Sequence, residues 1–263
     1  MRPAPSPLQQ WWVLTLRVIA PTVRNGEMLI AVALSAVFTA SFYLPLKQMM
    51  SNFVPGSGSY AQYLMPLIAI QAVFFAAMSA AIRSATDSVQ GIERRFRVMP
   101  MSSFIPLAAR MTANGYRCAI ALGIAVACGY VIGFRFYGDA VRTGVFCVLV
   151  LLMGLSLSLV GDLIGVAVHN PEATPHLLLL PQLILGYLSV GIQPVDQFPT
   201  WIQPVVRYQP ISVFVETLRA LAGNRDQVAK PVFSTVLPAL AYLIGISAAA
   251  AFLYSVVVSR MRR

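Results

Sequence analysis

Six long apolar stretches follow one another along the chain, and polar and basic residues gather between them. A stretch of about 20 residues with few charges can cross a hydrocarbon core of about 30 Å as an α-helix. The fifth stretch is the shortest and contains Pro175 and Pro181. We predict an all-α polytopic membrane protein whose six transmembrane helices lie near Glu27–Leu46, Tyr60–Ile82, Leu107–Phe134, Arg142–Val168, Thr174–Ile192 and Val232–Val258.

The segment before these stretches, residues 1–25, has a helical rather than a continuous apolar pattern. Between Leu8 and Ala20 the apolar side chains recur at helical spacing on one face, formed by Leu8, Trp11, Trp12, Leu16 and Ile19. Such a helix, with tryptophans at headgroup depth, is typical of one lying flat on a membrane. We predict an interfacial helix that ends at Pro21; an amphipathic helix buried against protein is the alternative.

Composition and charge agree with a membrane protein and indicate its orientation. Hydrophobic residues make up 58% of the chain, and its mean hydropathy is +0.73, far above that of a soluble domain. The net charge is +10, and most of the arginines lie in the N-terminal segment, after the second stretch and at the C-terminus. Because basic loops stay in the cytoplasm, we predict a plasma-membrane protein with both termini cytoplasmic, in which residues 26–263 form one domain. In such a protein the basic excess indicates contact with lipid headgroups rather than nucleic acid.

The chain lacks the motifs of the common catalytic sites. A P-loop needs a Gly-Lys-[Ser/Thr] run, but the only two lysines, Lys47 and Lys230, follow Leu46 and Ala229. With only His169 and His176, a histidine-based metal site or catalytic triad is not expected. We predict no enzyme activity, no metal and no cofactor in this chain.

The segment 91–103, GIERRFRVMPMSS, concentrates charge after the second apolar stretch. A helix over about 85–98 would end before Pro100, which disfavours the helical state at the residue preceding it. One face of this helix would be apolar, formed by Ile92, Phe96 and Met99, and basic residues would surround it. Docking into a groove of a partner protein and adsorption to anionic lipid both fit this composition.

The segment 193–222 lies before the last stretch and contains a shorter amphipathic helix. Pro210 suits the first turn of that helix, and Gly223 suits the position after its end. An apolar stripe is formed by Ile211, Phe214, Val215, Leu218 and Leu221. A polar stripe on the other side is formed by Ser212, Glu216 and Arg219, of which the last two are close enough to pair. We predict a re-entrant segment at the outer leaflet, acting as a gate or as a structural cap.

Charged residues also lie inside the predicted spans. Arg110, Asn114 and Arg117 share one face of the third span, and Asp162 lies in the fourth at comparable depth. A lone charge in hydrocarbon costs several kcal/mol, so we predict that Asp162 pairs with Arg117 or Arg110. A polar element of a translocation path or a proton relay is the alternative role.

Two of these segments resemble known motifs. The run DSVQGIERRFRVMPM at 87–101 is similar to the coupling segment of ABC-2-type exporter permeases, although Met99 and Arg94 depart from the usual residues. The run QPVDQFPTWIQPVVRYQPIS at 193–212 is similar to their outer segment, which has a Phe-Pro-x-Trp core. The resemblance implies an outer gate at Phe198, Pro199, Trp201, Glu216 and Arg219. It implies an ATPase-coupling helix at about 85–100 with contacts from Gly91, Ile92, Glu93, Arg94, Arg95, Phe96, Met99 and Pro100.

Further runs narrow the resemblance to the permeases of actinobacterial daunorubicin-resistance exporters, the DrrB type. They are RNGE at 24–27, RSATDS at 83–88, RRF at 94–96, CGYVIGFRF at 128–136 and RYQPIS at 207–212. The resemblance implies a separate P-loop ATPase of the DrrA type, which holds ATP and Mg²⁺, and a sister permease of the DrrC type or a second copy of this chain. The implied cargo is hydrophobic, an anthracycline drug or the lipid phthiocerol dimycocerosate. A proton-coupled drug exporter using Asp162 and a non-transporting scaffold are the alternatives.

Overall fold

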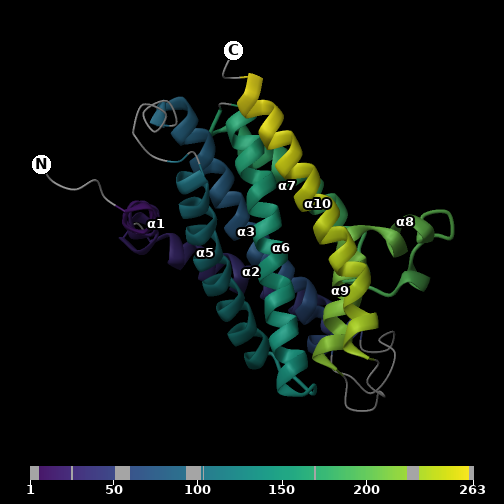
Figure 1. Cartoon of the computed structure of the whole chain (residues 1–263). Coiled ribbons are helices and arrows are strands. Elements are labelled where there is room, and N and C mark those ends of the chain that lie inside the picture. The colour runs from purple at the N-terminus through teal and green to yellow at the C-terminus, as the bar shows by residue number, and fades with distance from the viewer. Residues whose placement is uncertain are drawn as a thin grey trace, which may run out of the picture.

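The computed structural model describes residues 6–24, 26–50, 60–92, 102, 104–168, 170–223 and 231–260. Within these ranges the regular structure is entirely helical, in agreement with the predicted all-α class (Figure 1). The helices are α1 Pro7–Arg24, α2 Glu27–Met50, α3 Tyr60–Val89, α5 Phe104–Val131, α6 Ala140–Val168, α7 Ala173–Tyr187, the 3₁₀ turn η1 Val195–Gln197, α8 Gln203–Tyr208, α9 Pro210–Ala222 and α10 Val232–Arg260.

Four of the described helices are long and apolar enough to cross a membrane, namely Tyr60–Val89, Ile105–Val131, Ala140–Val168 and Val232–Tyr254. The helices α2 and α7 occupy the other two predicted positions. The helix α7 has 15 residues and reaches about 23 Å, which is shorter than a hydrocarbon core of about 30 Å. The count of six spans therefore stays a prediction.

The predicted fifth span is wrong at its C-terminal end, because α7 stops at Tyr187 rather than continuing to Ile192. The last carbonyls of a helix need partners from outside it. Here the Nε2 atom of Gln209 donates to the backbone oxygens of Leu185 and Leu188, at 3.1 and 2.6 Å. A side chain from the α8–α9 junction thus supplies the hydrogen bonds that a longer helix would have supplied.

The centre of the bundle is the contact between α3 and α6. Most of α3 is buried, and small residues let α6 approach it closely. A Cβ atom built on Gly165 would lie 2.8 Å from the backbone nitrogen of Ala85 and closer still to the backbone oxygen of Ala81. Packing between small residues is how membrane helices gain contact where lipid removes the hydrophobic driving force.

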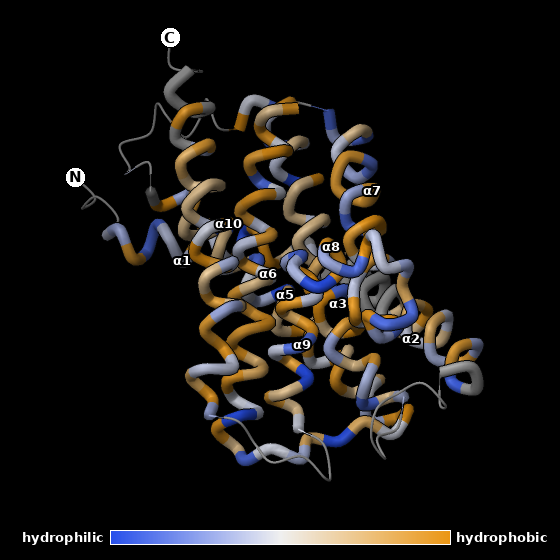
Figure 2. The backbone as a smooth tube through the Cα atoms, turned by 90° about the vertical axis from the view of Figure 1, so that its right-hand side faces the viewer, coloured by the Kyte–Doolittle hydropathy of each residue, from blue (hydrophilic) through white to orange (hydrophobic). Residues whose placement is uncertain are grey.

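The helix α1 runs across the bundle, whereas α3, α5, α6 and α10 run along it (Figures 1 and 2). Leu8, Trp12 and Leu16 are exposed on one side, while Thr15 and Thr22 are buried on the other. One side of this helix is therefore buried against protein, and a position of the other side at the membrane interface stays a prediction. The predicted end at Pro21 is wrong, because α1 continues to Arg24 and its last turn is held by hydrogen bonds to Thr22.

The predicted helix at about 85–100 does not begin where we expected, because its first residues belong to α3. Residues up to Val89 are the last turn of α3, and Gly91 then has a φ of +68°, which ends the helix. A glycine adopts this left-handed conformation without the steric cost that a Cβ atom brings. Residues 93–100 lie outside the described residues, so the rest of the coupling helix stays a prediction.

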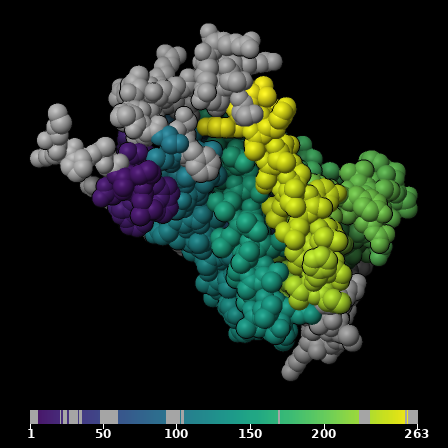
Figure 3. All heavy atoms as spheres, viewed as in Figure 1, coloured from purple at the N-terminus to yellow at the C-terminus, as the bar shows by residue number. Residues whose placement is uncertain are grey.

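The segment from η1 to α8 projects from the side of the bundle opposite to α1 (Figures 1 and 3). Beside it, α9 has the predicted apolar stripe, since Ile211, Phe214, Val215, Leu218 and Leu221 are all buried. The predicted ends of α9 are confirmed as well. Pro210 lies in its first turn, and Gly223 follows its last residue with a φ of +76°.

Candidate functional site

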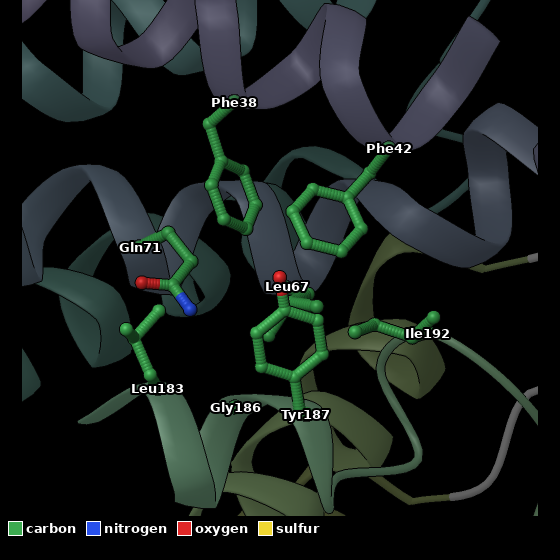
Figure 4. A pocket seen from close by; sticks show the side chains of 8 residues that line it. All are labelled: Phe38, Phe42, Leu67, Gln71, Leu183, Gly186, Tyr187 and Ile192. Carbon is green, nitrogen blue, oxygen red and sulfur yellow. The ribbon is translucent and has the colours of Figure 1, made fainter. Parts of the chain in front are cut away.

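An aromatic groove lies between α2, α3 and α7 (Figure 4). The space between its walls is about 200 Å³ when the open solvent at its mouth is counted. The groove is lined by Phe38, Phe42, Leu67, Gln71, Leu183, Gly186, Tyr187 and Ile192. The consecutive helices α2 and α3 and the much later helix α7 thus contribute to one concave, mainly apolar surface.

The aromatic wall comes from α2 and the end of α7. Phe38 and Phe42 are four residues apart and therefore share a face of α2, with ring centroids 4.5 Å apart. The ring of Phe42 also lies 5.8 Å from that of Tyr187, at an interplanar angle of 47°. Because all three rings are partly or fully accessible, they present a surface on which a planar or extended apolar molecule can stack.

The polar part of the groove is an amide from α3. Gln71 is buried, and its Oε1 atom accepts a hydrogen bond from Nε2 of the buried Gln182 on α7. Gly186 makes room for this pair, since a Cβ atom there would lie 3.0 Å from Nε2 of Gln71. Oε1 of Gln182 is buried and accepts no hydrogen bond from the described residues. The groove therefore combines aromatic walls with a polar amide pair at its side.

The size of the groove limits what it can hold. Pockets that enclose a drug-sized ligand measure about 300–1,000 Å³, and this groove is smaller. The groove is therefore a shallow surface rather than an enclosing pocket. Sequence reasoning did not identify the groove, because phenylalanines in an apolar span carry no signal of their own; Gln71 and Gln182 within apolar stretches were the available signal.

Two of the predicted coupling residues are described. Gly91 and Ile92 are half-buried at the end of α3. The remaining predicted coupling residues, Glu93, Arg94, Arg95, Phe96, Met99 and Pro100, lie outside the described residues. Their proposed contacts thus stay a prediction.

The predicted intramembrane polar residues make hydrogen bonds to different partners. Arg117 is only 6% exposed and donates from Nη1 to Oδ1 of Asn114, at 2.9 Å. Arg110 instead donates to the hydroxyl of Tyr254 on α10, at 3.1 Å. Asp162 is 1% exposed, and its backbone oxygen accepts a hydrogen bond from Ser84. A pairing of Asp162 with Arg117 or Arg110 stays a prediction.

Arg117 has further partners that the sequence pattern did not reveal. Its Nε atom donates to Oγ1 of Thr22 at 2.9 Å, and its Nη2 atom donates to the backbone oxygen of Val18 at 2.8 Å. Both partners belong to α1. A threonine on the inner side of an amphipathic helix was the only sequence signal of this contact.

The predicted outer gate divides into buried and exposed parts. Phe198 is buried, Pro199 is exposed and Trp201 is 77% exposed beside α8. Glu216 is exposed on α9, whereas the guanidinium of Arg219 points inward. The five residues thus differ in their exposure, and their joint role as a gate stays a prediction.

The predicted polar stripe is wrong at Ser212, which is buried, whereas the pairing of Glu216 with Arg219 stays a prediction. Nη2 of Arg219 donates to the backbone oxygens of Tyr63 and Val190, at 3.0 and 3.1 Å, and Ser212 is fully buried. Burial lowers the pKa of the Arg219 guanidinium, while Tyr63 and Glu216 act in the opposite direction. Arg219 thus donates to backbone oxygens of α3 and of the segment after α7. A hydrogen bond from a charged group is stronger in a buried setting than on the surface, which favours these partners over an exposed carboxylate.

The chain matches known transporter proteins over most of its length. Residues 28–256 match the model of the ABC-2 family transporter proteins. The chain is 43% identical over 258 residues to the doxorubicin resistance ABC transporter permease protein DrrB of Mycobacterium tuberculosis, covering 96% of this chain and 89% of that protein. It is 24% identical over 216 residues to the probable doxorubicin resistance ABC transporter permease protein DrrC of the same species, covering 82% and 75% of the two chains. It is 26% identical over 163 residues to the daunorubicin resistance ABC transporter permease protein DrrB1 of Streptomyces coeruleorubidus, covering 61% and 56%.

Proposed function

The chain belongs to the ABC-2 family of transporter proteins, and from this premise we propose that it is the membrane permease of an ATP-driven exporter of hydrophobic drugs. It is a transporter subunit rather than an enzyme, as the relatives' names also say of those proteins. The observation that carries the proposal is the 43% identity over 96% of the chain to a doxorubicin resistance permease. A lipid of the phthiocerol dimycocerosate class is a second cargo of the same apolar character.

We further propose that the energy comes from a separate P-loop ATPase of the DrrA type, with ATP and Mg²⁺ bound there. A permease of this kind needs such a partner, since the sequence contains no P-loop. The segment from Gly91 to Pro100 is the proposed contact, with Ile92 and Phe96 on its apolar edge. Capture of the ATPase on the tagged chain, lost in Ile92→Glu and Phe96→Glu but kept in Arg97→Gln, would support this contact. Unchanged capture in both glutamate variants would refute it.

The second permease of the proposed pore is a sister chain of the DrrC type or another copy of this chain. The support is that this chain is similar to two permeases of one species, Mycobacterium tuberculosis, which are named DrrB and DrrC. We place the complex in the plasma membrane with both chain termini in the cytoplasm, because the basic residues gather in those segments.

The aromatic groove is the proposed contact for cargo. A fused planar ring system stacks on aromatic side chains, and each such contact contributes about 0.5–1.5 kcal/mol beyond area burial. We expect Phe42→Ala and Tyr187→Ala to raise the half-saturating doxorubicin concentration about three- to tenfold at unchanged expression. Phe233→Ala is the matched control, because Phe233 is 77% exposed on α10 and far from the groove in the sequence.

The test of the function is efflux of fluorescent doxorubicin from cells that express this chain with its ATPase and sister permease. The proposal predicts efflux that stops on ATP depletion and continues when a protonophore collapses the proton gradient. Efflux that survives ATP depletion and stops with the protonophore would instead establish proton coupling, and Asp162→Asn would then abolish it. If doxorubicin is not exported but the lipid is released in an ATP-dependent way, the cargo is the lipid rather than the drug.

A further inference from the structure

The C-terminal turn of α1 is joined to α5 in a buried site. Arg117 of α5 donates two hydrogen bonds to α1, from Nε to the hydroxyl of Thr22 and from Nη2 to the backbone oxygen of Val18. Both donors come from one planar guanidinium, and the two distances are 2.9 and 2.8 Å. Thr22 and Arg117 are both buried, so water does not compete for these bonds. The contact is therefore specific in direction as well as in position.

The guanidinium is also held from its own helix. Nη1 of Arg117 donates to Oδ1 of Asn114, one turn earlier in α5, at 2.9 Å. An arginine can contact three acceptors at once because its donors are fixed in a plane, which the single ammonium of a lysine cannot reproduce. Asn114 thus orients the group, and Arg117 transmits that orientation to α1.

Two further hydrogen bonds hold α1 on the bundle. Arg83 of α3 donates from Nη1 to the same hydroxyl of Thr22, at 3.4 Å. Near the other end of α1, Nε1 of Trp11 donates to Oγ1 of Thr112, at 3.3 Å. Trp11 and Thr22 are separated by about 16 Å along the helix axis, so α1 is held on α5 at two distant points.

The opposite side of α1 is apolar and uncovered. Leu8, Trp12 and Leu16 recur every four residues and are all exposed. The helix α1 runs across the bundle, as Figure 2 shows, and the exposure of these side chains places the stripe away from the helices that α1 contacts. In a membrane protein such a stripe lies at the boundary of headgroups and acyl chains.

We propose that Arg117 and Thr22 form a rigid joint, through which α1 and α5 move as one body against the membrane surface. Arg117 is a positioning residue in this inference, because it acts through α1. The helix α5 is also the first described helix after the segment proposed to contact the ATPase. Displacement of that segment would therefore move α1 along with α5, a consequence that rests on the proposed function.

The first test needs neither cargo nor nucleotide, so its outcome is independent of the proposed function. Hydrogen exchange of α1 is measured in the full chain reconstituted in lipid nanodiscs. Thr22→Val removes the hydroxyl but keeps the shape, and loss of its charge-assisted hydrogen bonds predicts roughly tenfold faster exchange in α1. Thr22→Ser keeps the acceptor and should restore slow exchange, whereas Arg117→Lys should not. Equal exchange in the valine and serine variants would overturn the joint.

The second test asks whether the two helices move together during transport. Trp11→Cys and Thr112→Cys are introduced into a chain whose Cys118, Cys128 and Cys147 are replaced by alanine, and a short thiol crosslinker joins them. One rigid body predicts that efflux is the same before and after crosslinking. Efflux that is present before crosslinking and lost after it would overturn the proposal. Efflux that is absent before crosslinking would concern the proposed function, and the exchange measurement would then decide on the joint.

Discussion

The Cζ atom of Arg219 lies 3.6 Å from the centre of the Tyr63 ring, and Nη2 of the same guanidinium donates to the backbone oxygen of Tyr63. The hydroxyl of Tyr63 in turn donates to the backbone oxygen of Val190, at 2.8 Å, which Arg219 also contacts. This arrangement ties α9 to the start of α3 and to the segment after α7. It makes α9 part of the fixed core at this end of the bundle.

Replacing Arg219 should therefore affect folding before it affects transport. Arg219→Met removes hydrogen bonds from a charged donor and a cation–π contact, which together predict a loss of roughly 2 kcal/mol or more. The thermal unfolding midpoint of the detergent-solubilised chain measures this loss. Glu216→Gln, on the exposed side of the same helix, should change stability by less than about 0.5 kcal/mol. Similar midpoints for the two variants would contradict the inward role of Arg219.

Gly165 should tolerate no side chain, because α3 passes directly beside it. Gly165→Ala places a methyl group against the backbone of Ala81 and Ala85, and separating the helices predicts a loss of about 1–3 kcal/mol or failure to fold. Gly144→Ala is the matched control in the same helix, since a Cβ atom there has no neighbour within 4 Å. Expression and gel-filtration profile distinguish the two. A well-folded Gly165→Ala chain would show that α3 and α6 are farther apart than described.

Gln71 and Gln182 should behave as a coupled pair. Gln71→Leu or Gln182→Leu alone leaves one buried amide without its partner, which predicts a loss of about 1–3 kcal/mol. The double variant replaces both amides by apolar groups of similar size and should be more stable than the sum of the single losses predicts. A double-mutant cycle on thermal unfolding measures this difference. Strictly additive losses would mean that the two side chains do not interact.

Gln62 joins three segments at one end of the bundle. Its Nε2 atom donates to the backbone oxygens of Arg135 and Gly223, and its Oε1 atom accepts from the backbone nitrogen of Arg135. Gln62→Met keeps the length of the side chain but loses all three bonds, which predicts a loss of about 1–3 kcal/mol. Gln197→Met is the control, because Gln197 is exposed in η1. Limited proteolysis should cut the first variant faster and leave the second at the rate of the unchanged chain.

Local patterns were sufficient for the helices and for several of their ends. The length of the apolar stretches predicted α3, α5, α6 and α10, because burial of backbone groups in hydrocarbon requires helices of about that length. Pro210 and Gly223 predicted the ends of α9 through their own backbone preferences. The stripe from Ile211 to Leu221 followed from helical periodicity alone.

The partners of the polar residues required the tertiary structure. The sequence predicted Glu216 as the partner of Arg219, and Arg117 or Arg110 as the partner of Asp162, because spacing reveals only groups on the same helix or at a similar depth. The bonds described here instead reach the backbone oxygen of Val190 from Arg219 and that of Val18 from Arg117. Every residue carries such an oxygen, so no sequence pattern marks the one that will be chosen. The aromatic groove has the same origin, since Phe42 and Tyr187 come together only when α2 and α7 pack on α3.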